Sequence, residues 1–225
     1  MPLYQEIVRA ICFDMDGTLS DSDDVMVSRF SRLLKPFHFL FPRRQTTRIA
    51  RRIVMAIEAP ANFLMGIPDI FGLDEPLAWL IDLIYRKVGH KPKKTFLLVH
   101  GVKEMLAELS RRYPLAIVSA RDARTTNAFL EQFGLLPYFK CIATAQTCKH
   151  TKPFPDPILW AAKEMGVSPQ ACLMVGDTTV DMRAGRAAGA QKIGVLCGFG
   201  EKHELKKAGA DMILSTTEEL VQVLS

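Results

Sequence analysis

The 225-residue sequence has no apolar run approaching 18 residues, so no segment is long enough to cross a membrane as a helix. It has only five cysteines, an odd number, and no Cys-x-x-Cys pair. These absences argue against a disulfide framework and against the usual zinc ligand sets. The first residues also lack the charged and apolar regions of a secretory signal. We therefore expect a reduced, cytoplasmic protein with no membrane partner.

Charge of one sign is not concentrated anywhere in the chain. The formal net charge is +5 and the pI is near 9.0, yet no block of about five or six like charges occurs. A mildly basic protein suits a small anionic substrate as well as it suits nucleic acid. Hydrophobic residues make up 48% and charged residues 24%, which permits a well-buried core and argues against disorder.

Short apolar runs alternate with helical patterns through most of the chain. The runs are of a kind typical of buried parallel strands. They cover residues 7–13, 115–119, 141–144, 171–176 and 192–196. The helical patterns cover residues 102–112, 123–133, 157–165 and 179–188, and Gly134, Gly166 and Gly189 follow the last three as expected C-terminal caps. This alternation predicts an α/β fold with a doubly wound parallel sheet.

Residues 21–94 break the alternation, because they show only helical patterns punctuated by six prolines. The segment follows the first strand and its loop, next to the carboxyl edge where open α/β sheets bind ligands. We interpret it as an all-helical cap domain inserted into a core of residues 1–20 and 95–225. Extra helices packed directly on the sheet are the alternative.

Two carboxylates stand two residues apart where the first predicted strand ends. Asp14 and Asp16 precede Gly17, which permits a sharp turn. A carboxylate at a strand end can attack phosphorus if a metal ion screens the repulsion between the anions. The second carboxylate can then act as acid and base, and amides of the turn can hold phosphate oxygens. An Asp-x-Asp-Gly turn also occurs without any such role.

A second carboxylate pair follows the fourth predicted strand. Asp177 ends the run, and Asp181 lies one helical turn later on the same face. Hard oxygen ligands from few carboxylates suit Mg²⁺, with waters and substrate oxygens completing its shell. The alternative is that Asp177 only caps the next helix, but this leaves the spacing of the pair unexplained.

Two further polar residues stand at or near predicted strand ends. The hydroxyl of Ser119 could donate to a phosphoryl oxygen. The ammonium of Lys152, in a segment stiffened by alternating prolines, could stabilise phosphoryl charge. Each residue alone is more often a solvated loop residue, but their joint occurrence with the two carboxylate pairs favours a functional site.

These four motifs, in this order, resemble those of the haloacid dehalogenase superfamily, in its phosphoglycolate phosphatase-like branch with a helical C1-type cap. The likeness extends to residues 19–22, 198–200 and 208–211. It covers about residues 7–19 and 101–224, while the cap matches only in place, length and helical character. The resemblance implies a Rossmann-like core and a phosphatase.

The same resemblance implies a phosphoryl group carried on Asp14 as an aspartyl-phosphate. Asp14 would be the nucleophile and Asp16 the general acid and base, while Ser119 and Lys152 would hold the phosphoryl group. Phosphoryl transfer gains chiefly from positioning and charge stabilisation of this kind.

The resemblance also implies Mg²⁺ as the cofactor. Asp14 and Asp177 would bind the ion directly and Asp16 through its backbone carbonyl, while Asp181 would bind it through water or orient that shell. Four residues of the motif loops are expected to contact the substrate: Gly17, Thr18, Ala120 and Arg121.

Arg121 departs from the family pattern, which often places a small residue and Asn after the serine. A cation at this position could contact a second anionic group on the substrate. It could instead pair with Asp24 or Asp122, which we slightly prefer.

Four arginines of the predicted cap recur at helical spacing: Arg44, Arg48, Arg51 and Arg52. Such a face could recognise a carboxylate or a second phosphate, but an ordinary solvated face explains it as well. No aromatic residues interleave with these arginines, so a platform that stacks single-stranded nucleic acid has little support.

The sequence thus predicts a Mg²⁺-dependent phosphatase that acts on a small phosphorylated metabolite. Related dehalogenases lack the carboxylate of Asp16, and its presence leaves a phosphomutase as the nearest alternative. A non-catalytic module that binds a polyanion or protein is a further alternative. Phosphoglycolate, a sugar phosphate, a nucleotide and pyrophosphate remain open as substrates, as do a monomer and a homodimer.

Overall fold

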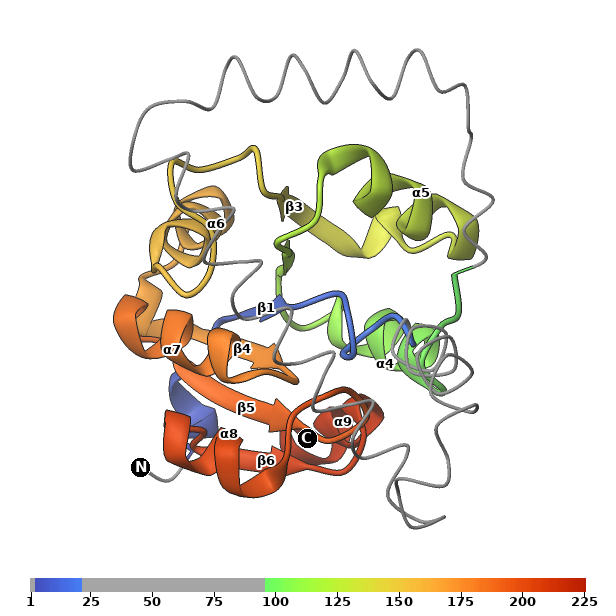
Figure 1. Ribbon diagram of the computed structural model, residues 1–225. Coiled ribbons are helices and arrows are strands. Elements are labelled where there is room, and N and C mark those ends of the chain that lie inside the picture. The colour runs from blue at the N-terminus through green and yellow to red at the C-terminus, as the bar shows by residue number, and fades with distance from the viewer. Residues whose placement is uncertain (1–2, 22–95) are drawn as a thin grey trace, which may run out of the picture. The chain divides into compact units, whose positions relative to one another are not determined.

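Six parallel strands form one sheet in the part of the chain that the structure, a computed structural model, describes: residues 3–21 and 96–225. The strands lie in the order β3-β2-β1-β4-β5-β6 (Figure 1). Their bounds are β1 Ala10–Phe13, β2 Leu115–Val118, β3 Phe139–Ala143, β4 Cys172–Gly176, β5 Gln191–Val195 and β6 Met212–Leu214.

The central strands are apolar at every position because their two faces enter two separate hydrophobic clusters. In β1, Ile11 and Phe13 lie in one cluster, while Ala10 and Cys12 lie in the other. Strands β2 and β4 alternate in the same way. Burial on both faces is why these strands appear in the sequence as continuous apolar runs.

Helices cover both faces of the sheet (Figure 1). The first cluster receives side chains from α4 (Val102–Leu109), α5 (Ala123–Phe133) and α9 (Leu220–Val223). The second receives them from α6 (Asp156–Met165) and α7 (Thr179–Ala188), and α8 (Lys202–Ala208) packs beside α7. The predicted α/β fold with a doubly wound parallel sheet is therefore confirmed.

Several element boundaries differ from the sequence prediction. Strand β1 begins at Ala10, because Gln5–Ile7 forms a short 3₁₀ turn. Further 3₁₀ turns cover Leu136–Tyr138, Pro169–Ala171 and Thr217–Glu219. Strand β6 and helices α8 and α9 were not predicted at all: β6 has three residues, and α8 buries only Leu205, so neither gives a clear periodic signal. The three predicted cap glycines do end α5, α6 and α7 in the left-handed conformation.

The strand order creates a switch point beside β1. The chain runs from β1 through β2 to β3 on one side, and from β4 through β5 to β6 on the other. Phe13, the last residue of β1, lies in register with Ile117 of β2 and Val175 of β4. The loops that follow these three strands therefore meet at one edge of the sheet, where open α/β folds bind ligands.

The predicted cap, residues 21–94, lies outside the described residues except for Asp21. The domain boundaries and the arginine face of the cap therefore stay predictions. Among residues 3–21 and 96–225, no helix is both long and apolar enough to span a membrane.

Candidate active site

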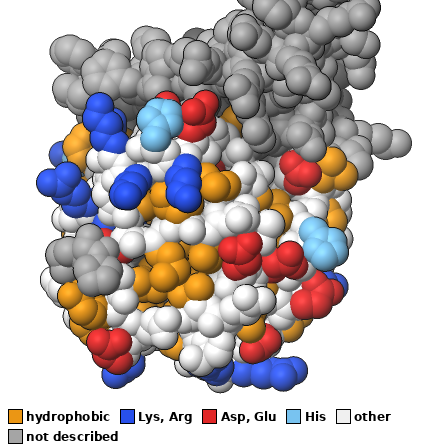
Figure 2. Space-filling model, turned by 90° about the horizontal axis from the view of Figure 1, so that it is seen from below, with side chains coloured by type: hydrophobic (Ala, Val, Ile, Leu, Met, Phe, Trp, Pro, Cys, Tyr) orange, Lys and Arg blue, Asp and Glu red, His pale blue; other side chains and the backbone are white. Residues whose placement is uncertain are grey.

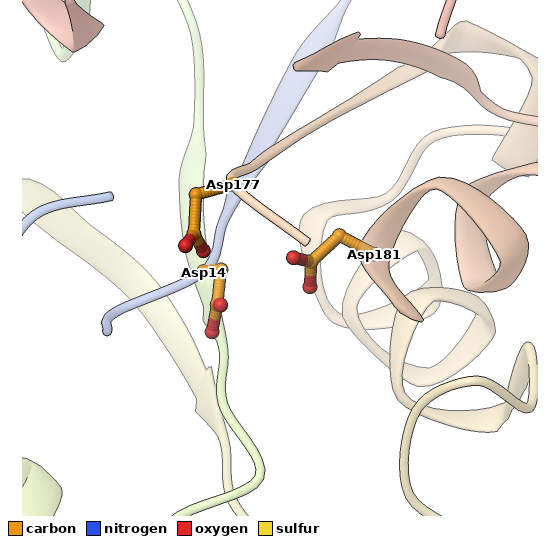
Figure 3. Close-up of side chains that lie close together, drawn as sticks. All are labelled: Asp14, Asp177 and Asp181. Atoms are coloured by element: carbon orange, nitrogen blue, oxygen red, sulfur yellow. The ribbon is translucent and has the colours of Figure 1, made fainter. Parts of the chain in front are cut away.

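Three buried carboxylates converge at the carboxyl edge of the sheet (Figure 3). Asp14 directly follows β1, Asp177 directly follows the neighbouring β4, and Asp181 projects from the first turn of α7. One oxygen from each lies within 4.8 Å of the others. The two carboxylate pairs predicted from the sequence thus form a single cluster, although they lie more than 160 residues apart in the chain.

Asp181 is fixed by the start of its own helix. Thr178 is the N-cap of α7, and its backbone N–H and hydroxyl donate to Oδ2 of Asp181 at 3.0 and 2.6 Å. This capping box holds the carboxylate in one rotamer. The alternative that Asp177 merely caps the helix is wrong, because Thr178 and Asp181 form the cap.

Lys152 supplies a positive charge to the cluster from the loop between β3 and α6. Its ammonium Nζ lies 2.7 Å from Oδ1 of Asp14 and 2.6 Å from Oδ1 of Asp181. The side chain is 4% exposed, so these contacts replace nearly all of its hydration. Lys152 and Asp14, which the sequence assigned to phosphoryl chemistry, are therefore in direct contact.

The charges in this cluster strongly perturb one another. Burial and the negative charge of Asp181 raise the pKa of Asp14 from its ordinary 3.8 to about 7, with a smaller contribution from Asp16, although Lys152 opposes the shift. Burial alone would lower the pKa of Lys152, yet the carboxylates of Asp14 and Asp181 raise it above its ordinary value. Ion-paired Lys152 thus stays protonated, whereas one ammonium is too little to keep Asp14 fully ionised at neutral pH.

Asp177 is held by the loop after β5. The N–H of Phe199 donates to its Oδ2 at 2.8 Å. Gly17 and Gly198 approach the same carboxylate so closely that a Cβ on either would collide with Oδ2. Residues 198–200 were predicted only to belong to the family likeness, and this contact was not predicted; the two glycines flanking Phe199 were the available signal.

Ser119 follows β2 and faces the same edge. It is buried, its N–H donates to the carbonyl of Ala143 at 2.9 Å, and its Oγ accepts the N–H of Arg121 at 3.1 Å. Since Oγ acts as an acceptor in this contact, its hydrogen remains available for donation to a ligand. The neighbouring Ala120 is exposed.

Asp16 is not a member of the three-carboxylate cluster and pairs with Arg121. Nε and Nη2 of Arg121 donate to the two oxygens of Asp16, each at 2.5 Å. The structure gives Arg121 a carboxylate partner, as the preferred prediction expected, but this partner is Asp16, which the prediction did not include. Of the two predicted partners, Asp122 caps α5 by accepting the N–H of Thr125 at 2.9 Å, and Asp24 lies outside the described residues, so its pairing stays a prediction.

Gly17 and Thr18 are engaged within the turn itself. The N–H of Gly17, whose φ is +69°, donates to the carbonyl of Ser20 at 2.9 Å. The carbonyl of Thr18 accepts the hydroxyl of Thr217 at 2.6 Å, and Thr18 is fully buried. These contacts shape the turn, and the substrate contacts expected of both residues stay predictions.

The donor set of the cluster fits a divalent cation. Three buried carboxylates against one ammonium leave an excess of two negative charges when all are ionised. Carboxylate oxygens are the ligands that Mg²⁺ prefers, usually one or two beside water and phosphate oxygens. Among the described residues, the cluster includes no carboxylate oxygen of Asp16, so the predicted role for Asp16 in metal binding rests on its backbone carbonyl alone.

Comparison with known proteins places these features in a family. Residues 11–195 match the family described as haloacid dehalogenase-like hydrolase. The chain is 30% identical over 215 residues to "Probable phosphatase IndB" of Dickeya dadantii, covering 94% of this chain and 91% of that protein. It is 27% identical to the phosphoglycolate phosphatase of Escherichia coli K12, covering 97% and 93%, and 26% identical to the pyrophosphatase PpaX of Oceanobacillus iheyensis, covering 96% and 97%.

Solved structures agree with this assignment. A conserved haloacid dehalogenase-like protein from Agrobacterium tumefaciens superposes with a TM-score of 0.68 at 27% identity, covering 96% of this chain and 97% of that one. A haloacid dehalogenase-like hydrolase from Streptococcus pneumoniae superposes with a TM-score of 0.65 at 25% identity, covering 98% and 100%. The chain therefore belongs to the haloacid dehalogenase-like hydrolases, in the phosphoglycolate phosphatase-like branch, and is a phosphatase-type hydrolase.

Proposed function

We propose that the protein is a Mg²⁺-dependent phosphohydrolase that cleaves a small phosphorylated metabolite through an aspartyl-phosphate on Asp14. The observation that carries this proposal is the contact between Asp14 and Lys152 inside the buried carboxylate cluster. Phosphoryl transfer to an aspartate requires a carboxylate nucleophile and a fixed cation, with further carboxylates within reach to hold a metal ion.

In the first step, a carboxylate oxygen of Asp14 attacks phosphorus and the bond to the ester oxygen breaks. Asp16 donates a proton to the departing oxygen, so that an alcohol leaves. Lys152 and Ser119 stabilise the phosphoryl oxygens by charge and by hydrogen bonding.

In the second step, water attacks the phosphorus of the aspartyl-phosphate. Asp16, now ionised, accepts the proton of that water, and the bond from phosphorus to Asp14 breaks. Inorganic phosphate leaves and both carboxyl groups return to their initial states. Mg²⁺ held by Asp14 and Asp177, with Asp181 orienting its shell, would supply the charge neutralisation that lets anionic groups approach one another.

The relatives suggest where to look for the substrate. Proteins of this branch carry the names phosphoglycolate phosphatase and pyrophosphatase. We infer a small anionic phosphate compound of this class and place phosphoglycolate first among the candidates. Contacts from Arg44, Arg48, Arg51 and Arg52, a cytoplasmic location, and a monomer or homodimer stay predictions of the sequence.

The binding-module alternative gains little support from the one face of the molecule that Figure 2 shows. On the face shown in Figure 2, lysine and arginine side chains lie beside acidic and apolar ones. A continuous basic face is what electrostatic binding of a polyanion requires. The phosphomutase alternative differs in outcome, since it would return the phosphoryl group to a substrate and release no phosphate.

The test is phosphate release from a panel of phosphoglycolate, sugar phosphates, nucleotides and pyrophosphate, with Mg²⁺ or with EDTA. We expect Mg²⁺-dependent release, and a loss of at least about 1,000-fold in kcat/KM in Asp14→Asn. Glu131→Gln, which alters an exposed carboxylate on α5, is the matched control. Release that persists in Asp14→Asn would refute the proposed nucleophile, and phosphoryl return without release would establish the mutase.

A further inference from the structure

The pair between Asp16 and Arg121 is the part of the site that the proposed reaction leaves unexplained. Two parallel N–H···O bonds of 2.5 Å join the guanidinium to both carboxylate oxygens. The side chains are 29% and 24% exposed, so both can be reached by a small molecule. A two-point contact of this kind fixes the plane of a carboxylate as well as its position.

Arg121 is itself held by contacts that do not involve Asp16. Its N–H donates to Oγ of Ser119 at 3.1 Å, and its carbonyl accepts the N–H of Ala145 at 2.9 Å. Its guanidinium carbon lies 5.9 Å from the centre of the Phe96 ring, within the range of a cation–π contact. The guanidinium is therefore placed by the loop after β2, and Asp16 aligns with a preformed partner.

Stability does not account for this pair. A partly exposed ion pair contributes about 0–1 kcal/mol. Arg121 also has a cost, because its Nη1 is buried and donates to no hydrogen-bond acceptor among the described residues. The pair joins the acid–base residue of the Asp14 loop to the loop of Ser119, so its position points to the reaction.

We propose that Arg121 is a positioning residue that holds the carboxyl group of Asp16 in the orientation needed for proton transfer to the leaving oxygen. The inference rests on the proposed function, because it assumes that Asp16 is the acid. A carboxylate offers about four acceptor sites, and Arg121 occupies two of them, one on each oxygen.

If Arg121 has this role, the decrease in kcat/KM that follows its removal depends on the leaving group of the substrate. An alkyl alcohol is a poor leaving group and needs protonation, whereas p-nitrophenolate leaves without it. General acid catalysis contributes about 10²–10⁴-fold, and a misplaced acid forfeits part of that gain. We expect Arg121→Ala to lower kcat/KM by about 10- to 100-fold for the best alkyl phosphate of the panel, but by less than about threefold for p-nitrophenyl phosphate.

The experiment measures kcat/KM on these two substrates for the wild type and five variants. The variants are Arg121→Ala, Arg121→Gln, Arg121→Lys, Asp16→Asn and the double variant Arg121→Ala/Asp16→Asn. The ratio kcat/KM includes only the steps up to the aspartyl-phosphate, so the later hydrolysis does not enter. Arg124→Ala, which alters an exposed arginine on α5, is the matched control and should behave as the wild type on both substrates.

Three results support the proposal together. Asp16→Asn shows the same selectivity between the substrates as Arg121→Ala, the double variant is no worse than Asp16→Asn, and Arg121→Lys recovers part of the alkyl rate. Lysine restores the charge without the two-point contact, so its recovery is incomplete. Thermal unfolding confirms that each variant is folded, and Arg121→Gln serves in place of the alanine variant if that variant is not.

Other results overturn it. Equal losses on both substrates would assign Arg121 to the phosphoryl group or to the fold. Additive losses in the double variant would mean that Arg121 acts independently of Asp16. If Asp16→Asn is selective and Arg121→Ala is not, this inference fails while the proposed function stands. If wild-type turnover does not depend on Asp14, both fail.

Discussion

Two carboxylate–cation pairs at the same edge of the sheet differ sharply in burial. Asp14 and Lys152 have side chains only 10% and 4% exposed, whereas Asp16 and Arg121 are 29% and 24% exposed. Each pair joins the loop after β1 to a loop that follows another strand. The first pair sits among two further carboxylates, and the second sits near solvent.

This difference separates two physical tasks within a span of three residues. In the buried pair, lost hydration and neighbouring charge raise the pKa of Asp14 to about 7, so a further cation is needed to keep Asp14 fully ionised at neutral pH. A group that exchanges protons with an alcohol and with water needs access instead, which the exposed pair provides. In the proposed mechanism, Lys152 and a bound metal ion would therefore compensate the charge of Asp14, and Arg121 would orient Asp16.

The largest effect is expected from removing a carboxylate of the buried cluster. Asp177→Asn keeps the shape of the side chain but removes the charge of a predicted Mg²⁺ ligand, and loss of even an outer-shell partner of a metal costs about 10–100-fold in affinity. We expect Mg²⁺ affinity to fall at least about 100-fold, with phosphate release lost at limiting Mg²⁺. Calorimetric titration with Mg²⁺ measures this, and Glu131→Gln is the control. Unchanged affinity would remove Asp177 from the metal site.

The buried pair is expected to matter strongly for stability. Lys152→Met leaves Asp14 and Asp181 without their cation, and breaking a buried pair costs about 3–5 kcal/mol. We expect the free energy of unfolding in EDTA at about pH 8 to fall by that amount, and Mg²⁺ to restore part of it. Urea unfolding measures both, with exposed Lys163→Met on α6 as the control. Equal stability of the two variants would contradict the account.

A pH dependence follows from the raised pKa of Asp14. The folded chain holds a proton on Asp14 up to about pH 7, whereas the unfolded chain releases it near 3.8. Folded protein therefore binds more protons in this window, so its stability in EDTA should decrease as pH rises from about 4 to 7. Urea unfolding across this range tests the sign, and Asp14→Asn should flatten the slope. If Asp14→Asn leaves the slope of the free energy of unfolding against pH unchanged, another group causes the pH dependence.

The exposed pair is expected to contribute least to stability. Arg121→Ala should change the free energy of unfolding by less than about 1 kcal/mol, because solvent screens the pair. Urea unfolding of Arg121→Ala and Lys152→Met in one experiment compares the contributions of the two pairs to the free energy of unfolding. A loss as large as that of Lys152→Met would show that the exposed pair holds the fold together.

The sequence predicted the parts of the fold that have strong local signals. Strands β1, β2 and β4 are uniformly apolar, and α5 and α7 have the predicted bounds, because an apolar face and a terminal glycine are both visible in the chain. Strand β6 escaped prediction because three residues at the sheet edge carry too little pattern.

The site residues that directly follow strands could be predicted from the sequence. Asp14, Ser119 and Asp177 follow β1, β2 and β4, and parallel strands bring their ends together. The pairing of Arg121 with Asp16 was not predictable, because it depends on side-chain directions across 105 residues of sequence. The contact of Phe199 with Asp177 likewise depends on how the loop after β5 folds back.

The most direct test of the account is to trap the aspartyl-phosphate. The enzyme is quenched with acid during turnover of its best substrate with Mg²⁺, reduced with borohydride, and digested for peptide mass spectrometry. An acyl phosphate on an aspartate is reduced to homoserine, so the account predicts homoserine at position 14, dependent on substrate and Mg²⁺ and missing in Asp14→Asn. Rapid phosphate release with unmodified Asp14 under every quench time, or reduction at another carboxylate, would contradict it.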